Sequence, residues 1–523
     1  MSQHSEQKVD KFLVIITLVA TLLAFVWSLM DSQAFIDSMI TAKNYVTAKL
    51  GWFFLLSVFI MVPFLFYLAF SKYGDMKLGN EEDKPEFSTF SWVALLFGAG
   101  LGTGYVFWPF AESLWHFYKT PYLAESASKA AYLASKGATM IHWGFHQWAI
   151  YSLVALVIAF PAFRMNKPMT VAGAFYGLMG EKCYTSVLGR SIEALTTITA
   201  IWGAAAANCL GLMLFTVGLK QIFGIEVGIY GTATIMFLII ISYTVAAYSG
   251  LQKGIKFIGD SNAYLAMILF AFILLWGPTA HLLDGMVETI GQYFNYYFSM
   301  SLFADSQNLS DGWNKDWTIF YWLWNMSWAP FVGGFIARIS RGRTIKQFLL
   351  GVLIIPVAVS FAWFGVLTTA TQYVDAHQLV NVWEQVQQNP ANGPYAVASA
   401  FGGGTIIHIV IFLSVAGFLI TSADAAAFFV AIQTSYGSLN PNKILILVWG
   451  LAIGAVSIVL LSANGIDGVK FAGVLAGVPF LLLIWVMWYS FWKLLNKEYA
   501  VHAQKKEEAY IEKLKLKILG GNN

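Results

Sequence analysis

Long apolar runs alternate with short polar segments along almost the whole chain. A run of about 20 apolar residues can cross the roughly 30 Å hydrocarbon layer of a membrane as an α-helix. The polar segments between the runs are rich in Gly, Pro, Asn and Lys, as loops are. The pattern predicts twelve crossings, at 11–30, 50–70, 89–118, 138–163, 190–220, 227–248, 252–280, 316–337, 344–372, 405–433, 442–463 and 467–493.

The composition agrees with this pattern. Of the 523 residues, 58% are hydrophobic and only 11% are charged, which is too little charge to cover a soluble protein of this length. The net charge of +3 gives no indication of a nucleic-acid partner. No nucleophile elbow, P-loop or dinucleotide-binding motif occurs, so we expect neither an enzyme nor an ATP-driven pump. We predict an all-α polytopic membrane protein.

The distribution of Lys and Arg predicts the orientation of the chain. If both termini are cytoplasmic, 23 of the 31 basic residues lie on the cytoplasmic side. Such an excess is what the positive-inside rule requires. An even number of crossings agrees with this orientation.

The chain can be divided into five segments. Residues 1–88 hold an N-terminal tail and two peripheral crossings, and residues 89–280 hold crossings three to seven. Residues 281–315 form an amphipathic interfacial helix and an external loop. Residues 316–493 hold crossings eight to twelve, and residues 494–523 form a cytoplasmic tail rich in Lys and Glu, which is expected to be helical.

Helix-breaking residues mark the third and eighth crossings. The third contains four glycines between Gly98 and Gly104, and the eighth contains Pro330, Gly333 and Gly334. Interrupted helices at matching places indicate two five-helix halves and a transporter site between them. The alternative is close helix packing through small residues. We favour interruption, because each glycine costs a helix roughly 1 kcal/mol.

Aromatic residues on the fourth and eighth crossings can form a site for a cation. If 138–163 is one helix, Trp143, Trp148 and Tyr151 fall within an arc of about 140°. Trp324 and Trp328 lie four residues apart on the eighth crossing. Aromatic faces attract cations, and quaternary ammonium groups suit them. The alternative is an interfacial aromatic belt.

Several motifs resemble those of one family. The segments at 316–328 (DWTIFYWLWNMSW) and 334–343 (GFIARISRGR) resemble the signature of the betaine/choline/carnitine transporter (BCCT) family. The stretches at 98–104, 142–151 and 421–424 are similar to further motifs of the family. The resemblance spans nearly the whole chain. It implies a leucine-transporter-type fold with two peripheral helices and a 5+5 inverted-repeat core, a homotrimer, and a place in the bacterial cytoplasmic (inner) membrane.

The resemblance also implies roles for individual residues. Trp143, Trp148 and Tyr151 resemble members of the family's aromatic box, and Trp328 resembles the tryptophan next to it. Asn325 departs from the family, which usually has a second tryptophan directly after the one that matches Trp324. This departure leaves open a zwitterion with N–H donors, such as taurine or a small amino acid.

The glycine run can bind the other end of a zwitterion. Family members that prefer choline tend to carry an aspartate at the position of Gly104. A carboxylated substrate instead needs backbone N–H groups and a half-helix N-terminus. These groups can come from Gly100, Leu101, Gly102 and Gly104. We therefore expect a zwitterion of the glycine betaine or carnitine type.

The coupling ion is expected to be Na⁺. In sodium-coupled relatives, hydroxyls that match Thr421 and Ser422 join backbone carbonyls, which here belong to Gly98, Leu101 and Phe418. The alternative is that these hydroxyls bond to the preceding helical turn. Sodium-independent antiporters of the family carry a basic side chain in the fifth crossing. No Lys or Arg lies between Arg190 and Lys220, which favours symport over exchange.

The remaining charged and metal-binding residue types have structural interpretations. We expect the acidic residues Glu112, Glu193, Asp260 and Asp424 to pair with Arg338, Arg341 or Arg343, with a proton relay as the alternative. His142 and His146 are four residues apart but lack further metal ligands, so we expect hydrogen-bonded core histidines. Cys183 and Cys209 predict no disulfide. The expected function is Na⁺-coupled import of a zwitterionic osmolyte by alternating access, with no other cofactor. A channel or osmosensor is a further alternative.

Overall fold

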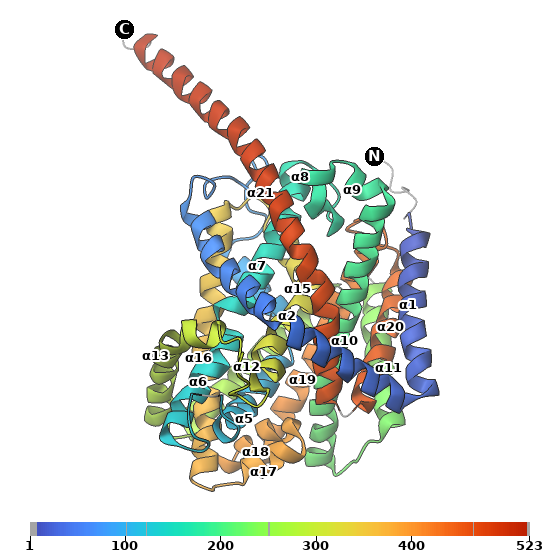
Figure 1. Ribbon diagram of the computed structural model, residues 1–523, viewed down its shortest axis with the longest axis vertical. Coiled ribbons are helices and arrows are strands. Elements are labelled where there is room, and N and C mark those ends of the chain that lie inside the picture. Colours follow the sequence, from blue (N-terminus) through green and yellow to red (C-terminus); the bar gives the residue numbers. More distant parts are fainter. Residues whose placement is uncertain (1–7, 101, 122, 249–251, 464, 520–523) are drawn as a thin grey trace.

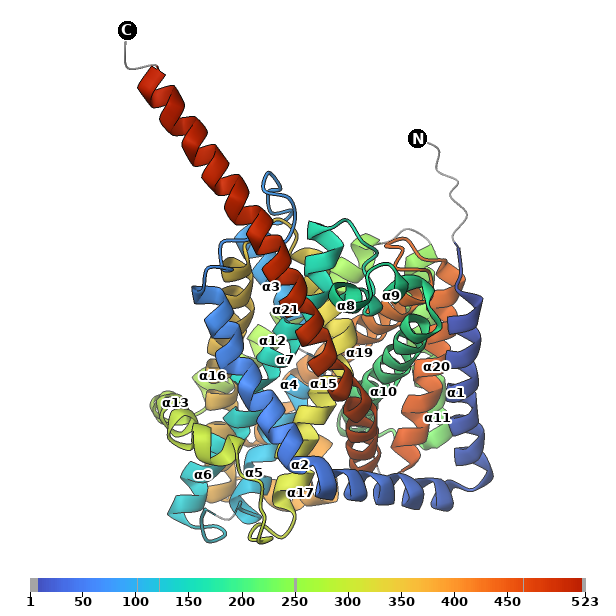
Figure 2. The same ribbon diagram turned by 45° about the horizontal axis from the view of Figure 1, so that its top comes forward.

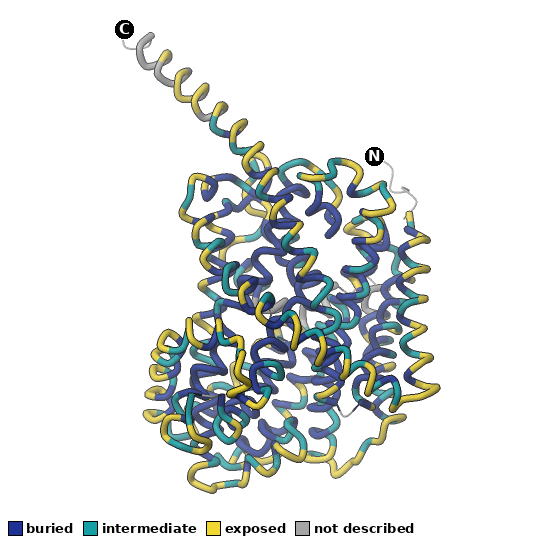
Figure 3. The backbone as a smooth tube through the Cα atoms, in the orientation of Figure 1, coloured by how far each residue is buried: buried dark blue, intermediate teal, exposed yellow. Residues whose placement is uncertain are grey.

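The computed structural model describes residues 8–100, 102–121, 123–248, 252–463 and 465–519. These residues form a bundle of helices, shown in two views (Figures 1 and 2). Most residues inside the bundle are buried, and most exposed residues lie on its outer faces and on the projecting end of the last helix (Figure 3). The predicted all-α class is confirmed.

The first half of the chain contains these helices: α1 Lys11–Met30, α2 Ser32–Phe70, α3 Thr89–Gly100, α4 Gly104–Phe107, α5 Glu112–Tyr118, α6 Lys129–Trp143, α7 Phe145–Ala159, α8 Tyr176–Met179, α9 Lys182–Thr185, α10 Val187–Phe223, α11 Ile229–Tyr248 and α12 Gln252–Trp276. Short helical turns lie at η1 Trp108–Phe110, η2 Phe160–Arg164 and η3 Ala172–Phe175.

The second half contains these helices: α13 Thr279–Ser301, α14 Trp313–Asp316, α15 Thr318–Ile339, α16 Ile345–Ala376, α17 Val382–Gln388, η4 Pro390–Asn392, α18 Gly393–Ala400, α19 Gly404–Gln433, α20 Lys443–Ser462 and α21 Ile466–Leu519. Within the described part of the chain, nine helical segments are long and apolar enough to cross a membrane. The chain is therefore a multi-pass membrane protein.

The third crossing is broken, as the glycine run predicts. Helix α3 ends at Gly100, and α4 begins at Gly104 and is followed by η1 and α5. Leu101 lies outside the described residues. Thr103 holds the restart of the helix in place, because its hydroxyl donates to the carbonyl of Ala207 on α10 at 3.1 Å.

The eighth crossing is not broken, which corrects the prediction made from Pro330, Gly333 and Gly334. Helix α15 runs without interruption through Pro330. A Cβ on Gly333 would lie 2.7 Å from Val154 Cγ1, and a Cβ on Gly334 would lie 2.6 Å from Phe429 Cε2. These glycines therefore serve close packing of α15 against α7 and α19, which was the alternative interpretation.

The fourth crossing is not one helix, so the arc that places its aromatic residues on one face does not apply. Helix α6 ends at Trp143, and α7 begins at Phe145. Gly144 between them has φ −96° and ψ −141°. The N–H of Phe145 donates to the hydroxyl of Tyr293 on α13 at 3.1 Å, which gives this backbone group a partner outside the helix.

Three further helices differ from the prediction in extent or confirm it. Helix α2 begins at Ser32 and not near residue 50. A helix is present where the interfacial helix was expected, α13. The expected tail helix is also present, but it continues the last crossing as one helix, α21. Figures 1 and 2 show the end of α21 projecting from the side of the bundle where α1 begins.

Candidate substrate and ion site

The broken crossing passes close to an indole ring and a hydroxyl group. A Cβ on Gly102 would lie 3.2 Å from Cη2 of Trp328 and 3.9 Å from Oγ of Ser422. These residues belong to α15 and α19. The structure therefore places three predicted site residues from three elements around one point of non-helical backbone.

Trp143 lies beside the point where the crossing resumes. A Cβ on Gly104 would lie 2.9 Å from Cη2 of Trp143. The indole is only 3% exposed. It stacks on Phe364 at a centroid distance of 4.8 Å and lies edge to face with Tyr105 at 5.1 Å. Its Nε1–H donates to Glu112 Oε2 at 2.8 Å. The ring is thus held on both its polar edge and its apolar face.

Trp148 and Tyr151 form a second group on α7. Their rings meet edge to face at 5.8 Å, and both are fully buried. The Tyr151 hydroxyl donates to Asn325 Oδ1 on α15 at 3.0 Å. Asn325 is 3% exposed, and its Nδ2 has no hydrogen-bond partner in the described part of the chain. Asn325 therefore offers a buried amide donor beside the aromatic residues.

Trp324 lies beside the indoles of Trp143 and Trp328. Its ring lies 5.2 Å from Trp328 and 6.4 Å from Trp143, edge to face in both cases. It also stacks on Phe320 at 5.4 Å. All five predicted aromatic residues are buried in the protein and none faces lipid. The interfacial-belt alternative does not describe their positions.

The structure describes the positions of some, but not all, of the predicted sodium ligands. The Thr421 hydroxyl donates to the Gly417 carbonyl at 2.9 Å and lies 3.4 Å from the Phe418 carbonyl, so it makes the bonds to the preceding turn that were the alternative. Ser422 is close to Gly102, as described above. Gly98 lies near the end of α3, and Leu101 lies outside the described residues.

Several residues around Trp143 were not predicted as part of the site. Tyr105 touches the indole edge, and its hydroxyl lies 2.9 Å from Ser360 Oγ. Phe364 lies under the indole face. Tyr321 on α15 donates its hydroxyl to Glu112 Oε2 at 2.6 Å. The sequence could have indicated Tyr105, because it directly follows Gly104. Phe364 lies within an apolar run, and nothing in the sequence distinguishes it as a site residue.

Glu112 does not pair with an arginine, so that expectation is wrong. Its Oε1 lies 3.1 Å from His116 Nε2 and 2.6 Å from His142 Nδ1. The expected partners bind elsewhere: Arg338 to Glu86, Arg341 to Asp83, and Arg343 to the carbonyl of Phe87. Glu193 likewise accepts from the N–H of Ala172 at 2.8 Å.

Glu112, His116 and His142 are close enough to share a metal ion, since one ligand atom from each lies within 4.8 Å of the others. The donor set does not suit a metal. Trp313 donates its indole N–H to His116 Nδ1 at 3.1 Å, and an indole can only donate. His116 Nε2 therefore carries a proton and donates to Glu112. A metal-bound histidine instead donates its second N–H to an acceptor.

The two histidines of the fourth crossing behave differently. His142 is hydrogen-bonded, as expected, and its Nε2 also lies 3.1 Å from Thr318 Oγ1. His146 is buried and stacks on Trp322 at 4.7 Å, but, contrary to the expectation, neither of its nitrogens has a hydrogen-bond partner among the residues that the structure describes. They do not form a joint site.

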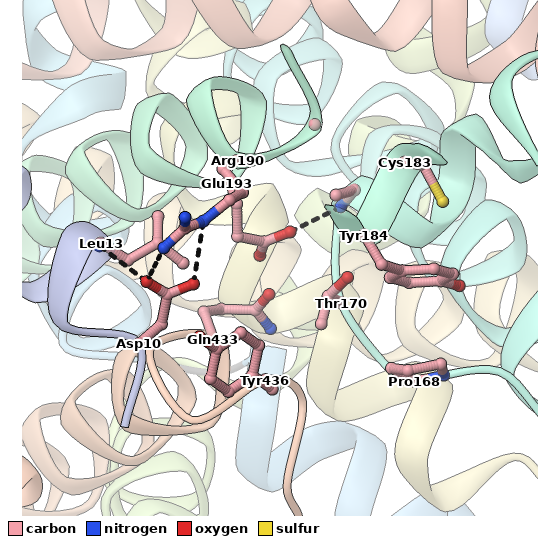
Figure 4. Close-up of a pocket in the computed structure, with 12 residues that line it drawn as sticks. Asp10, Leu13, Pro168, Thr170, Cys183, Tyr184, Arg190, Glu193, Gln433 and Tyr436 are labelled. Atoms are coloured by element: carbon pink, nitrogen blue, oxygen red, sulfur yellow. Dashed lines mark hydrogen bonds and ion pairs between the residues drawn. The ribbon is translucent and has the colours of Figure 1, made fainter. Parts of the chain in front are cut away.

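A separate pocket of about 70 Å³ lies where α1 and α10 begin (Figure 4). Asp10 forms an ion pair with Arg190, and its N–H donates to the carbonyl of Thr434 at 2.9 Å. Cys183 also lines this pocket, and burial raises the pKa of its thiol to about 12. Both cysteines are free, as predicted. The pocket shares no residue with the site described above.

Comparison with known proteins gives consistent matches over almost the whole chain. Residues 12–500 match the family described as "BCCT, betaine/carnitine/choline family transporter". The chain is 35% identical over 465 residues to the ectoine/hydroxyectoine transporter of Virgibacillus pantothenticus, covering 89% of this chain and 92% of that protein. It is 34% identical over 484 residues to the glycine betaine transporter OpuD of Bacillus subtilis (strain 168), covering 92% and 94%.

A third relative is the high-affinity choline transport protein of Escherichia coli (strain K12), which is 32% identical over 459 residues, covering 87% of this chain and 67% of that protein. These relatives are transporters, so the expectation that the chain is not an enzyme is confirmed. The match to the family extends from the first crossing into the last helix. The chain therefore belongs to the betaine/carnitine/choline transporter family.

Proposed function

We propose that this protein is a Na⁺-coupled symporter that imports a small zwitterionic osmolyte, of the glycine betaine or carnitine type, by alternating access. The relatives named for glycine betaine and choline transport support a quaternary-ammonium substrate. The buried tryptophans support it further, because aromatic faces stabilise a desolvated cation by about 2 kcal/mol or more.

One observation carries the proposal: Gly102 lies close to both the Trp328 ring and the Ser422 hydroxyl. Substrate and ion would therefore meet the same unwound segment. The ammonium end would contact the rings of Trp143, Trp148, Tyr151, Trp324 and Trp328. The carboxylate would take backbone N–H groups of Gly100, Leu101, Gly102 and Gly104. Na⁺ would bind Ser422 and Thr421 with carbonyls of Gly98, Leu101 and Phe418, since hard oxygen ligands suit a hard cation.

Asn325 favours a second candidate substrate class. Its Oδ1 accepts from Tyr151 and has a second lone pair, to which a substrate N–H group can donate and a quaternary ammonium group cannot. Its Nδ2, which has no hydrogen-bond partner among the described residues, can donate to the carboxylate of any zwitterion. Taurine, a small amino acid and ectoine belong to this class, and the first-named relative above is an ectoine/hydroxyectoine transporter.

The coupling mode, orientation and assembly complete the proposal. No Lys or Arg lies between Arg190 and Lys220 on α10, which supports symport over sodium-independent exchange. Both termini are proposed to be cytoplasmic in the inner membrane, because 23 of the 31 basic residues then lie inside. The family resemblance supports a homotrimer.

Uptake into liposomes that contain the purified protein tests the proposal. Initial rates are measured for glycine betaine, carnitine, choline, taurine and ectoine, each with an inward Na⁺ gradient and with K⁺ in its place. We expect saturable, Na⁺-dependent uptake of one or more carboxylated substrates and weak uptake of choline. Equal rates in Na⁺ and K⁺ would contradict the ion coupling. A preference for choline would contradict the role of the glycine run.

A further inference from the structure

We propose that Glu112 is a positioning residue for substrate binding: its carboxylate holds the indole of Trp143 over Gly104. The inference rests on the proposed function, in which Trp143 contacts the substrate. Glu112 itself begins α5, in the outer half of the broken crossing. It would act only through the ring that it orients.

The geometry around the carboxylate supports this role. Glu112 is fully buried, and both of its oxygens are used. Oε2 accepts from the Trp143 indole at 2.8 Å and from the Tyr321 hydroxyl at 2.6 Å. Oε1 contacts His116 and His142 at 3.1 and 2.6 Å. One carboxylate therefore joins α5, α6 and α15 around the ring of Trp143.

Among the described residues, Glu112 is the acceptor for the indole N–H, so the orientation of the ring depends on this bond. The ring of Trp143 also stacks on Phe364 and lies edge to face with Tyr105, Tyr321 and Trp324. Aromatic packing fixes the plane of an indole less strictly than a charge-assisted hydrogen bond fixes its N–H. Loss of the bond should therefore turn the ring without unfolding the cluster.

Replacing the carboxylate with an amide gives a specific test. In Glu112→Gln, one oxygen becomes an NH₂ group that faces a pair of former donors. The Tyr321 hydroxyl can turn to accept, and so can His142 by changing its tautomer. Trp143 cannot accept, and His116 cannot because Trp313 fixes its tautomer. Whichever way the amide is turned, its NH₂ group therefore faces the N–H of either Trp143 or His116, so that two donors oppose each other.

Trp143→Phe removes this conflict, because phenylalanine has no N–H. The amide can then place its NH₂ group toward Tyr321 and keep its oxygen for the histidines. Glu112→Gln should therefore be harmful in the wild-type background and nearly neutral in the Trp143→Phe background. A double-mutant cycle measures this difference directly.

A matched control is available on α15. Trp322 is also fully buried, but its indole N–H has no hydrogen-bond partner among the described residues. Trp322→Phe makes the same chemical change as Trp143→Phe. The effect of Glu112→Gln should be the same in the Trp322→Phe background as in the wild type.

The experiment measures the KM and maximal rate of Na⁺-driven uptake, and the thermal unfolding of the purified protein, for each member of both cycles. We expect Glu112→Gln to raise KM about tenfold in the wild type and in Trp322→Phe, because a buried donor is left unsatisfied, and less than twofold in Trp143→Phe. The maximal rate per folded protein should change less than KM.

The outcomes separate the two proposals. An unchanged KM in Glu112→Gln, or equal increases in the Trp143→Phe and Trp322→Phe backgrounds, would overturn the positioning role. Failure of the proposed function would appear differently, as absence of saturable uptake by the wild-type protein. The unfolding temperatures then still decide whether Glu112 and Trp143 are coupled, since additive shifts would refute the coupling.

Discussion

Gly104 should not tolerate even one added methyl group. In Gly104→Ala, the new Cβ would lie 2.9 Å from Cη2 of Trp143 and 3.5 Å from Cδ1 of Trp108. The first distance is too short, so one of the two groups has to move. Trp143 does not move freely, because its N–H is bonded to Glu112 at 2.8 Å and its face is stacked on Phe364 at 4.8 Å.

The cost can be estimated from these contacts. Overfilling a packed site by one methyl group costs about 1 to 3 kcal/mol. If the strain turns the indole away from the substrate, binding loses a cation–π contact of roughly 0.5 to 2 kcal/mol. With a factor of ten for every 1.4 kcal/mol, KM should rise between about twofold and thirtyfold.

Two other glycines provide controls for this measurement. A Cβ on Gly454, in α20, would lie 2.6 Å from Cδ1 of Ile240, a similar overlap that does not involve Trp143. A Cβ on Gly291, in α13, would meet no atom within 4 Å. We expect Gly454→Ala to lower the unfolding temperature without changing KM. We expect Gly291→Ala to leave KM unchanged and to raise the unfolding temperature slightly, because alanine favours a helix over glycine by about 1 kcal/mol.

The assay is initial uptake rate against substrate concentration, with the amount of folded protein measured separately. A KM for Gly104→Ala within twofold of the wild type would refute the reasoning, provided that the variant is folded. An equal rise in KM for Gly454→Ala would also refute it, because the effect would then come from general destabilisation.

Three other predictions follow from the site and its surroundings. Thr421→Val combined with Ser422→Ala should abolish the Na⁺ dependence of uptake, because the proposed oxygen ligands are removed; rates that still respond to Na⁺ would contradict the ion site. Asn325→Leu should weaken uptake of zwitterions that carry N–H groups about tenfold more than it weakens uptake of betaines, because only substrates with N–H groups can donate to the amide oxygen. Competition assays measure the ratio of the two losses, and an equal loss of uptake for both substrate classes would contradict this assignment. Arg190→Ala should lower the unfolding temperature by several degrees with KM unchanged, because it leaves the buried carboxylate of Asp10 with one ionic partner fewer, a loss of roughly 1 to 3 kcal/mol; differential scanning measurements check the shift, and a changed KM would link this junction to the substrate site.

Hydrophobic patterning predicted the helical class and the break in the third crossing because both depend on local sequence. Four glycines within seven residues cannot easily continue a helix, whatever surrounds them. The glycines after Pro330 gave the same local signal but a different result. Their Cβ positions are filled by Val154 and Phe429, and packing of distant helices is not visible in a single segment.

The aromatic residues are buried, but the helix that was expected to carry three of them on one face is interrupted. The arc assumed that residues 138–163 form one helix, and Gly144 breaks the helix after Trp143 and before Trp148 and Tyr151. One glycine in an apolar run is usually tolerated within a helix. Only the partner of the freed backbone N–H of Phe145, the Tyr293 hydroxyl, distinguishes this glycine, and that partner lies far along the chain.

The partners of Glu112 show why charge counting fails inside a membrane protein. The sequence offered three arginines, and pairing a buried carboxylate with one of them is the obvious expectation. An arginine, however, brings a second desolvation cost into the bundle. Hydrogen bonds from Trp143 and Tyr321 satisfy the carboxylate without a second charge, and His116 donates in its neutral form. Arg338 and Arg341 instead pair with Glu86 and Asp83, where both partners are accessible to water, and Arg343 donates to the carbonyl of Phe87. A buried acidic residue in an aromatic-rich bundle should therefore be matched first with indole, phenol and imidazole donors, and the residues that supply them are the ones whose orientation it fixes.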